Sequence, residues 1–156
     1  MVEASKRLRQ IGMYKRVFLD ANIFIDMEND DRSSYEDISK IFKFLIETKA
    51  TIYTSCDLIT TIYYILAKKD KQKALTSIEK INRFCKIIEF SNKEVESTCR
   101  LMREDKNFKD LEDTMQYILA RKVFSDLIIS NDKNFMSIDI KVMNSKKFLK
   151  EVSHGS

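Results

Sequence analysis

The sequence of 156 residues is poor in the residues that many enzyme sites need, with one histidine, two glycines, three cysteines and no proline or tryptophan. The single histidine, His154, argues against Ser-His-Asp or Cys-His catalysis and against histidine-rich metal sites. The glycines, Gly12 and Gly155, stand apart, whereas a Walker loop or a dinucleotide fingerprint needs several glycines close together. Any enzymatic chemistry must therefore use carboxylates, hydroxyls, amides, lysines or a metal ion.

The sequence also supports neither a framework of disulfides nor a membrane-spanning segment. The three cysteines have no CxxC spacing, so we expect them to be buried as small apolar side chains. Charged residues interrupt every long apolar stretch, so no transmembrane helix is expected. The charged first 16 residues lack the apolar core of a secretory signal. We therefore expect a cytoplasmic protein with no membrane partner.

The length fits one domain that buries its own core. We place this domain at residues 16–152, between an N-terminal extension (1–15) and a short tail (153–156). The net charge of +4 is concentrated at the two ends of the chain, and the middle is acidic. This distribution fits a metal site flanked by surfaces that bind a polyanion, and it fits an ordinary solvated surface equally well.

Short apolar segments alternate with amphipathic helical patterns along the chain. We expect strands at residues 16–19, 51–54, 86–90, 126–130 and 141–143. Helices are expected between them and after the last strand, with capping boxes at Ser33–Ser34 and at Ser91. This alternation predicts an α/β domain with a central parallel sheet. In such sheets, ligands bind beyond the carboxyl ends of the strands.

Acidic side chains are predicted at that edge of the sheet. Asp20 directly follows the first strand, and Asp132 comes just after the fourth. Asp110 and Asp113 stand at the start of a helix, where Asp110 has the features of an N-cap and Asp113 of the N3 residue. Carboxylates are the ligands that Mg²⁺ or Mn²⁺ prefers, and two such ions can promote phosphodiester hydrolysis. The acidic segment that holds Asp26, Asp30 and Asp31 is interpreted as a solvated loop.

The joint pattern resembles the PIN-domain ribonucleases, particularly the VapC-like toxins of toxin–antitoxin pairs. Its four motifs stand here as Val17-Phe18-Leu19-Asp20-Ala21-Asn22, as Thr54-Ser55 before a helix with Tyr63-Tyr64, as Asp110-Leu111-Glu112-Asp113, and as Ile128-Ile129-Ser130-Asn131-Asp132 with Phe135. The resemblance implies a three-layer α/β/α fold and Mg²⁺- or Mn²⁺-dependent cleavage of RNA to 5′-phosphate and 3′-hydroxyl ends. It also implies a cognate antitoxin whose C-terminal segment fills the acidic crevice, and a homodimer.

Carried over motif by motif, the resemblance makes Asp20, Asp113 and Asp132 catalytic metal ligands. Asn22 and Ser130 would orient the carboxylates or the attacking water, with Asp110 in support. The glutamate that the second motif usually carries falls on Thr61, which supplies no carboxylate. Asp57, one helical turn earlier, either replaces that glutamate or only complements the helix dipole.

Further side chains have two interpretations each. Tyr63 and Tyr64 are expected in the core rather than stacked on RNA bases. The lysines after their helix are expected to contact RNA phosphates or to form a solvated face; they are Lys68, Lys69, Lys71 and Lys73.

Two rival functions remain open. Thr61 favours a catalytically weak or inactive PIN fold that binds RNA or protein. A phosphatase of the haloacid dehalogenase type would use Asp20 as nucleophile, but Asn22 stands where that class needs a second acid.

Overall fold

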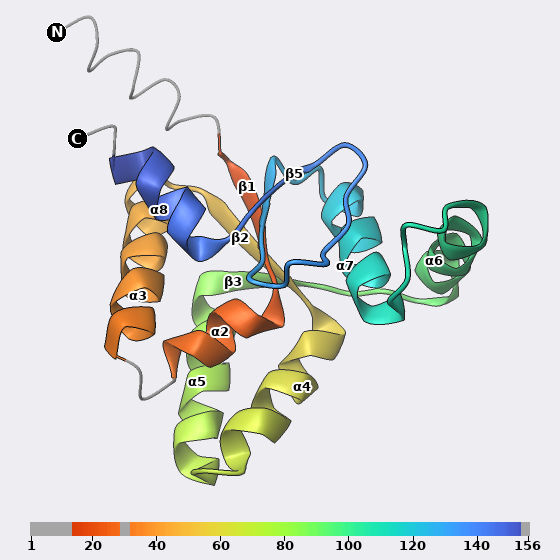
Figure 1. The fold of residues 1–156 in the computed structure, drawn as a ribbon. Helices are drawn as coiled ribbons and strands as arrows, with labels where there is room; N and C mark the ends of the chain where they lie inside the picture. Colours follow the sequence, from red (N-terminus) through yellow and green to blue (C-terminus); the bar gives the residue numbers. More distant parts are fainter. Residues whose placement is uncertain (1–13, 29–31, 154–156) are drawn as a thin grey trace, which may run out of the picture.

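The computed structural model describes residues 14–28 and 32–153, which form one parallel sheet with helices on both sides (Figure 1). The strands are β1 (Arg16–Leu19), β2 (Thr51–Ser55), β3 (Cys85–Ile88), β4 (Leu127–Ile129) and β5 (Lys141–Met143). The helices are α2 (Ala21–Met27), α3 (Arg32–Glu47), α4 (Cys56–Ala67), α5 (Lys71–Phe84), α6 (Asn92–Glu104), α7 (Leu111–Lys122) and α8 (Ser145–Ser153). The predicted three-layer α/β/α fold with a central parallel sheet is confirmed.

The sheet has the strand order β3-β2-β1-β4-β5, which makes β1 the central strand. Val17, Phe18 and Leu19 of β1 are fully buried, as expected for a strand covered by helices on both faces. Leu19 is paired with Ile129 of β4, so the residues that follow these strands leave the sheet side by side. The Asp20 N–H donates to the Ile129 carbonyl at 3.1 Å, which extends the pairing one residue beyond β1.

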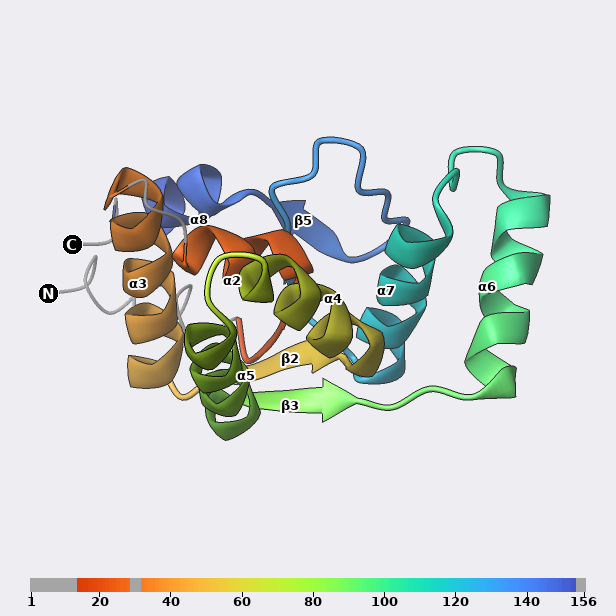
Figure 2. The same cartoon turned by 90° about the horizontal axis from the view of Figure 1, so that it is seen from below.

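Two groups of helices lie at opposite sides of the molecule. In both views, α6 and α7 are on one side, and α3 and α8 are on the other (Figures 1 and 2). The acidic segments come from different parts of this arrangement, because Asp20 precedes α2 at the central strand and Asp113 lies on α7. The position of α7 relative to the sheet therefore decides whether these acids meet.

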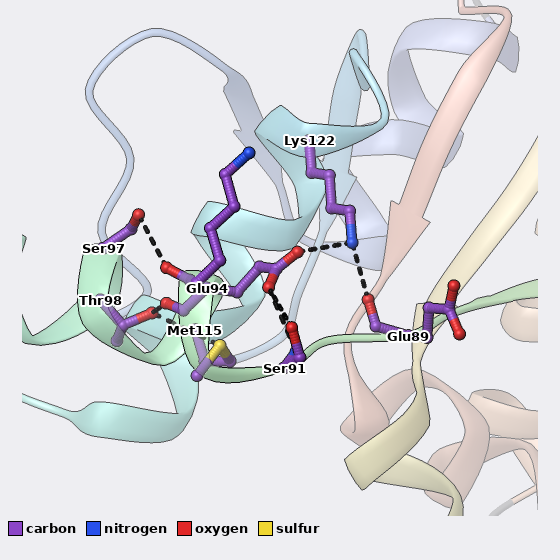
Figure 3. Close-up of polar contacts among 8 residues, drawn as sticks. Glu89, Ser91, Glu94, Ser97, Thr98, Met115 and Lys122 are labelled. Carbon is purple, nitrogen blue, oxygen red and sulfur yellow. Dashed lines mark hydrogen bonds and ion pairs between the residues drawn. The ribbon is translucent and has the colours of Figure 1, made fainter.

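An ion pair between Lys122 and Glu94 fixes α7 against α6 (Figure 3). Lys122 donates to Glu94 Oε1 at 2.6 Å and to the Glu89 carbonyl at 3.0 Å. The ammonium of Lys122 and the backbone N–H of Ser91 lower the pKa of Glu94 to about 2. Ser91 and Glu94 form the capping box expected at the start of α6. The hydroxyl of Thr98, also on α6, contacts the Met115 sulfur on α7 at 3.4 Å, which adds a second tie between the helices.

Several local expectations were wrong. The helix α3 already includes Arg32, so Ser33 and Ser34 lie within its first turn and not before it. Only Cys85, the first residue of β3, is buried, whereas Cys56 in α4 is half-buried and Cys99 in α6 is exposed.

Tyr63 and Tyr64 were expected in the core, but they are 37% and 67% exposed on the outer face of α4. Residues 1–13 of the N-terminal extension and residues 154–156 of the tail lie outside the described residues. Within the described ranges, no helix is both long and apolar enough to cross a membrane.

Candidate active site

Asp20 is the buried centre of the acidic edge, with 4% of its surface exposed. It caps α2, because its Oδ1 accepts the Ala21 N–H at 2.7 Å. Its Oδ2 accepts the Ser130 hydroxyl at 2.7 Å and the Asn22 amide at 3.1 Å. Burial raises the pKa of Asp20, while the hydrogen bonds from Ser130 and Ala21 oppose that rise. The side chain is thus held in one orientation at the end of the central strand.

Ser130 connects Asp20 to Asp132. Its hydroxyl oxygen accepts the Asp132 N–H at 3.1 Å while its hydrogen goes to Asp20. Asp132 in turn accepts the Asn134 N–H at 2.8 Å, which closes a tight turn after β4. The two neighbouring strand ends therefore hold Asp20 and Asp132 together, and the negative charge of Asp132 adds to the rise in the pKa of Asp20.

Asn131 joins this turn to the two helices on either side. Its N–H donates to Asn22 Oδ1 at 3.2 Å, and its side-chain amide donates to Asp26 at 3.0 Å. Its side-chain oxygen accepts the N–H and the hydroxyl of Ser145 at the start of α8. Asp26 is therefore half-buried and bonded in α2, which corrects its interpretation as part of a solvated loop. Asp30 and Asp31 lie outside the described residues.

The start of α7 brings further carboxylates to the same edge. Asp110 is the N-cap, as expected, and its Oδ1 accepts the Asp113 N–H at 2.9 Å. Burial raises the pKa of Asp113 to about 8, together with a hydrogen bond to the Asp132 carboxyl group and the charges of Asp20, Asp132 and Asp110. The structure thus brings Asp20, Asp113 and Asp132, which come from three separate segments, to the same edge of the sheet.

The second motif contributes Asp57 more directly than Thr61. Loss of hydration and then the charge of Asp57 raise the pKa of Glu112 on α7, so Asp57 lies near the start of that helix. Ser55 donates its hydroxyl to Asp57, which holds the carboxylate at the start of α4. The Thr61 hydroxyl donates to the Asp57 carbonyl at 3.5 Å, within its own helix.

The donor chemistry of this site fits a hard divalent cation. Carboxylates that raise one another's pKa are stabilised when a dication takes the place of the shared proton. A buried amide oxygen of Gln116, near Asp20, has no hydrogen-bond partner among the described residues. Across residues 14–28 and 32–153, no three acidic, cysteine or histidine side chains already form a metal-binding group. The carboxylates therefore have the chemistry of ligands for a divalent cation and lie at one edge of the sheet. They are not already arranged as a complete set of metal ligands.

A cavity of about 680 Å³ opens beside Asp132 and runs to the start of α8. Its lining includes Ser130, Asn131 and Asp132 together with three lysines, Lys133, Lys146 and Lys147. None of the four lysines expected from the sequence as RNA contacts, at positions 68, 69, 71 and 73, lines it. The basic C-terminal end of the chain was the only sequence signal for Lys146 and Lys147, and Lys133 had none. Gln116 was missed altogether, because a polar residue within a helix carries no signal of its burial.

Comparison with known proteins gives consistent matches. The sequence profile of the PIN domain matches residues 16–134. The protein named Ribonuclease VapC1 from Aquifex aeolicus (strain VF5) is 45% identical over 134 residues, which cover 86% of this chain and 93% of that protein.

Two crystal structures have a similar fold. VapBC2 from Rickettsia felis, bound to a DNA fragment from its promoter, matches with a TM-score of 0.62 and 20% identity over 83% of this chain and 98% of that one. VapC20 from Mycobacterium tuberculosis, described as a toxin that cleaves the sarcin-ricin loop, matches with a TM-score of 0.60 and 15% identity over 76% of this chain and 92% of that one.

Proposed function

Because this chain belongs to the PIN-domain family, we propose that it is a Mg²⁺- or Mn²⁺-dependent endoribonuclease and the toxin of a toxin–antitoxin pair. The ribonuclease VapC1 of Aquifex aeolicus supports this proposal, since the similarity extends over most of both chains. The observation that carries it is the convergence of Asp20, Asp113 and Asp132, whose mutual charges and burial raise the pKa of Asp113 to about 8.

In the proposed site, Asp20, Asp113 and Asp132 hold the divalent cation. When bound, a cation of this type lowers the pKa of water and neutralises charge on a phosphodiester. Ser130 and Asn22 keep the Asp20 carboxylate aimed by donating to its Oδ2. Asp57 adds negative charge from α4, in place of the carboxylate that Thr61 does not supply. Asp110 acts through α7, because its cap fixes the helix turn that carries Asp113.

The substrate is proposed to lie along the cavity beside Asp132. Lys133, Lys146 and Lys147 line that cavity and supply positive charge for RNA phosphates. Asp132 and the start of α8 both line the cavity, so a strand bound there would place one phosphate beside Asp132 and its neighbours near the lysines. A cognate antitoxin is the proposed protein partner, and a homodimer is the proposed assembly.

Incubation of the purified chain with RNA tests the function. Mn²⁺ should support cleavage that a chelator abolishes and that Asp20→Asn removes while the protein stays folded. Glu79→Gln, which neutralises an exposed acid on α5, is the matched control and should cleave normally. Asp20→Asn activity equal to the wild type would refute the site.

A binding module is the second candidate, and the observation that favours it is the Thr61 hydroxyl, which bonds within its own helix. RNA binding without cleavage in Mn²⁺ by the wild type would establish this candidate and would reject the nuclease.

A further inference from the structure

A second cavity, of about 220 Å³, opens beside Asp113. One wall is formed by residues 107–110 and the start of α7, and the other by Asn134 and Met136 in the segment after β4. The lining combines two carboxylates, two side-chain amides and two apolar side chains, which belong to Asp110, Asp113, Asn107, Asn134, Phe108 and Met136. This mixture differs from the lysine-rich lining of the larger cavity.

The two cavities share the turn after β4. Asp132 and Lys133 line the larger cavity, whereas Asn134 lines the smaller one. The Asp132 carboxylate accepts the Asn134 N–H at 2.8 Å, so the turn that contributes to both cavities has a fixed shape. Asp113 lines the smaller cavity and Asp132 the larger, so an RNA strand bound at the acids has a cavity next to each of them.

Tyr117 ties both walls of the smaller cavity to α7. Its ring packs against that of Phe108 with 5.4 Å between centroids, and Phe108 is only 4% exposed. Its hydroxyl donates to Asp139 Oδ1 at 2.5 Å, which holds the segment between β4 and β5 that forms the other wall. The Asn107 N–H donates to Asp105 Oδ1 at 3.0 Å and fixes the turn before Phe108. The cavity is therefore preformed rather than a gap between loose segments.

The lining fits an uncharged ring with polar edges better than it fits a phosphate. Lys109 is the only basic residue among the described residues that line the cavity, whereas Asp110 and Asp113 are both acidic. The bonds that hold Asn107 and Asn134 use their backbone N–H groups, so their side-chain amides remain available as donors and acceptors. Single-stranded RNA is recognised in this way, by apolar contact with unstacked bases and by hydrogen bonds to their edges.

From this arrangement, we propose that the smaller cavity receives a nucleobase next to the cleaved phosphate and that Asn107 and Asn134 recognise the edge of this base. The protein thus selects the base at one position beside the cut, while the lysines of the larger cavity bind phosphates whatever their bases are. The inference rests on the proposed function, because it names the part of the RNA that the same site selects.

A set of short RNAs tests the inference once the cleaved bond has been mapped on a mixed-sequence RNA. Each of the two nucleotides that flank this bond is replaced in turn by the four bases and by an abasic residue. At one flanking position, kcat/KM of the wild type with Mn²⁺ should differ by roughly 10-fold or more between the best and the worst base. The abasic RNA should be cleaved no better than the worst base. Equal kcat/KM for all five RNAs at both positions would overturn the inference.

Asn134→Ala and Asn107→Ala locate the selection in the smaller cavity. Asn134→Ala keeps the backbone N–H that Asp132 accepts, so the turn should stay folded. In each variant, kcat/KM should fall more for the preferred RNA than for the abasic one, and the preference among bases should narrow. Asn82→Ala, which removes an exposed amide on α5 outside the cavity, is the matched control and should keep the full preference.

Two results with these variants would overturn the inference. They are an unchanged base preference in both cavity variants, and an equal loss on all five RNAs, since a merely disturbed fold would slow every substrate alike. Failure of the wild type to cleave any RNA with Mn²⁺ would reject the proposed function, and the inference with it. Cleavage without base preference would reject the inference alone.

Discussion

The Ser130 hydroxyl donates to the buried Asp20 carboxylate at 2.7 Å and accepts the Asp132 N–H at 3.1 Å. One hydroxyl group therefore ties the Asp20 carboxylate to the backbone of Asp132 at the neighbouring strand end. This contact depends on the pairing of Leu19 with Ile129, because a slip of one residue would turn Ser130 to the other face of the sheet. The register of β1 and β4 is thus a determinant of the site.

Ser130→Ala should weaken both the fold and the site. The substitution leaves the buried Asp20 carboxylate without one donor, which should lower the free energy of unfolding by about 1–3 kcal/mol. It also releases Asp132, so Mn²⁺ affinity and RNA cleavage should each fall by roughly 10- to 100-fold. Denaturant unfolding and calorimetric titration measure the two effects. Ser97→Ala, which removes a hydroxyl that bonds only within α6, is the control, and an equal loss in both variants would contradict the role of Ser130.

The metal-free fold should lose stability as pH rises, because Asp113 is held protonated in the folded state. Its pKa is raised from an ordinary value of 3.8 to about 8, so the folded protein binds this proton more tightly than the unfolded chain does. By linkage, the contribution of Asp113 is fully present below about pH 4 and is lost as pH rises through about 8. Melting temperatures in chelator should therefore favour Asp113→Asn over the wild type increasingly from pH 5 to pH 8.5. Parallel curves for the two proteins would show that Asp113 does not titrate in this range.

Much of this site follows from local pattern. The apolar run of β1 predicts a buried strand, and a parallel sheet then puts Asp20 and Asp132 at one edge. The cap at Asp110 likewise follows from residue type, because Asp accepts the free N–H groups of a helix start. These features depend on a few neighbouring residues, so the sequence alone is enough to find them.

Other features depend on how distant elements pack. The burial of Gln116 is decided by the docking of α7 near the end of β1, which no periodicity within α7 encodes. The hydrogen bond between Asp26 and Asn131 joins α2 to the turn after β4. Because this contact is tertiary, the sequence alone makes Asp26 resemble an acidic residue of a solvated loop. Lys146 and Lys147 were overlooked for the same reason, because α8 reaches the site through the pairing of β5 with β4 and the bonds of Ser145 to Asn131.

Charge removal at the cavity should weaken RNA binding rather than the chemical step. In the double variant Lys146→Gln/Lys147→Gln, KM for RNA should rise while kcat stays near the wild-type value. The dependence of binding on salt should become shallower by about one unit of log–log slope for each RNA phosphate that a lysine no longer neutralises. Lys71→Gln/Lys73→Gln removes the same charge from α5, outside the cavity lining, and serves as the control. Equal effects from the two double variants would indicate nonspecific attraction by the whole surface.

Asp57 is the carboxylate that α4 contributes to the proposed site. The charge of Asp57 raises the pKa of Glu112, and Thr61 lies one turn further along the same helix face. If Asp57 serves the site, Asp57→Asn should weaken Mn²⁺ binding, since affinity for hard cations rises with the number of charged ligands. A dipole role alone would instead lower the melting temperature slightly and leave Mn²⁺ affinity unchanged. Calorimetric titration and thermal melts of this one variant decide between the two roles.

Thr61→Glu makes the complementary test, because it restores the carboxylate that the family usually has at this position. In chelator, the added charge should repel Asp20, Asp113 and Asp132 and lower the melting temperature, since like charges at close range resist joint ionisation. With Mn²⁺, the same charge should tighten binding, so the rise in melting temperature on adding metal should exceed that of the wild type. Thr61→Gln, which adds similar bulk without charge, should show neither effect. If Thr61→Glu leaves metal affinity unchanged while Asp57→Asn lowers it, the position one turn earlier has taken over the role of the family's glutamate.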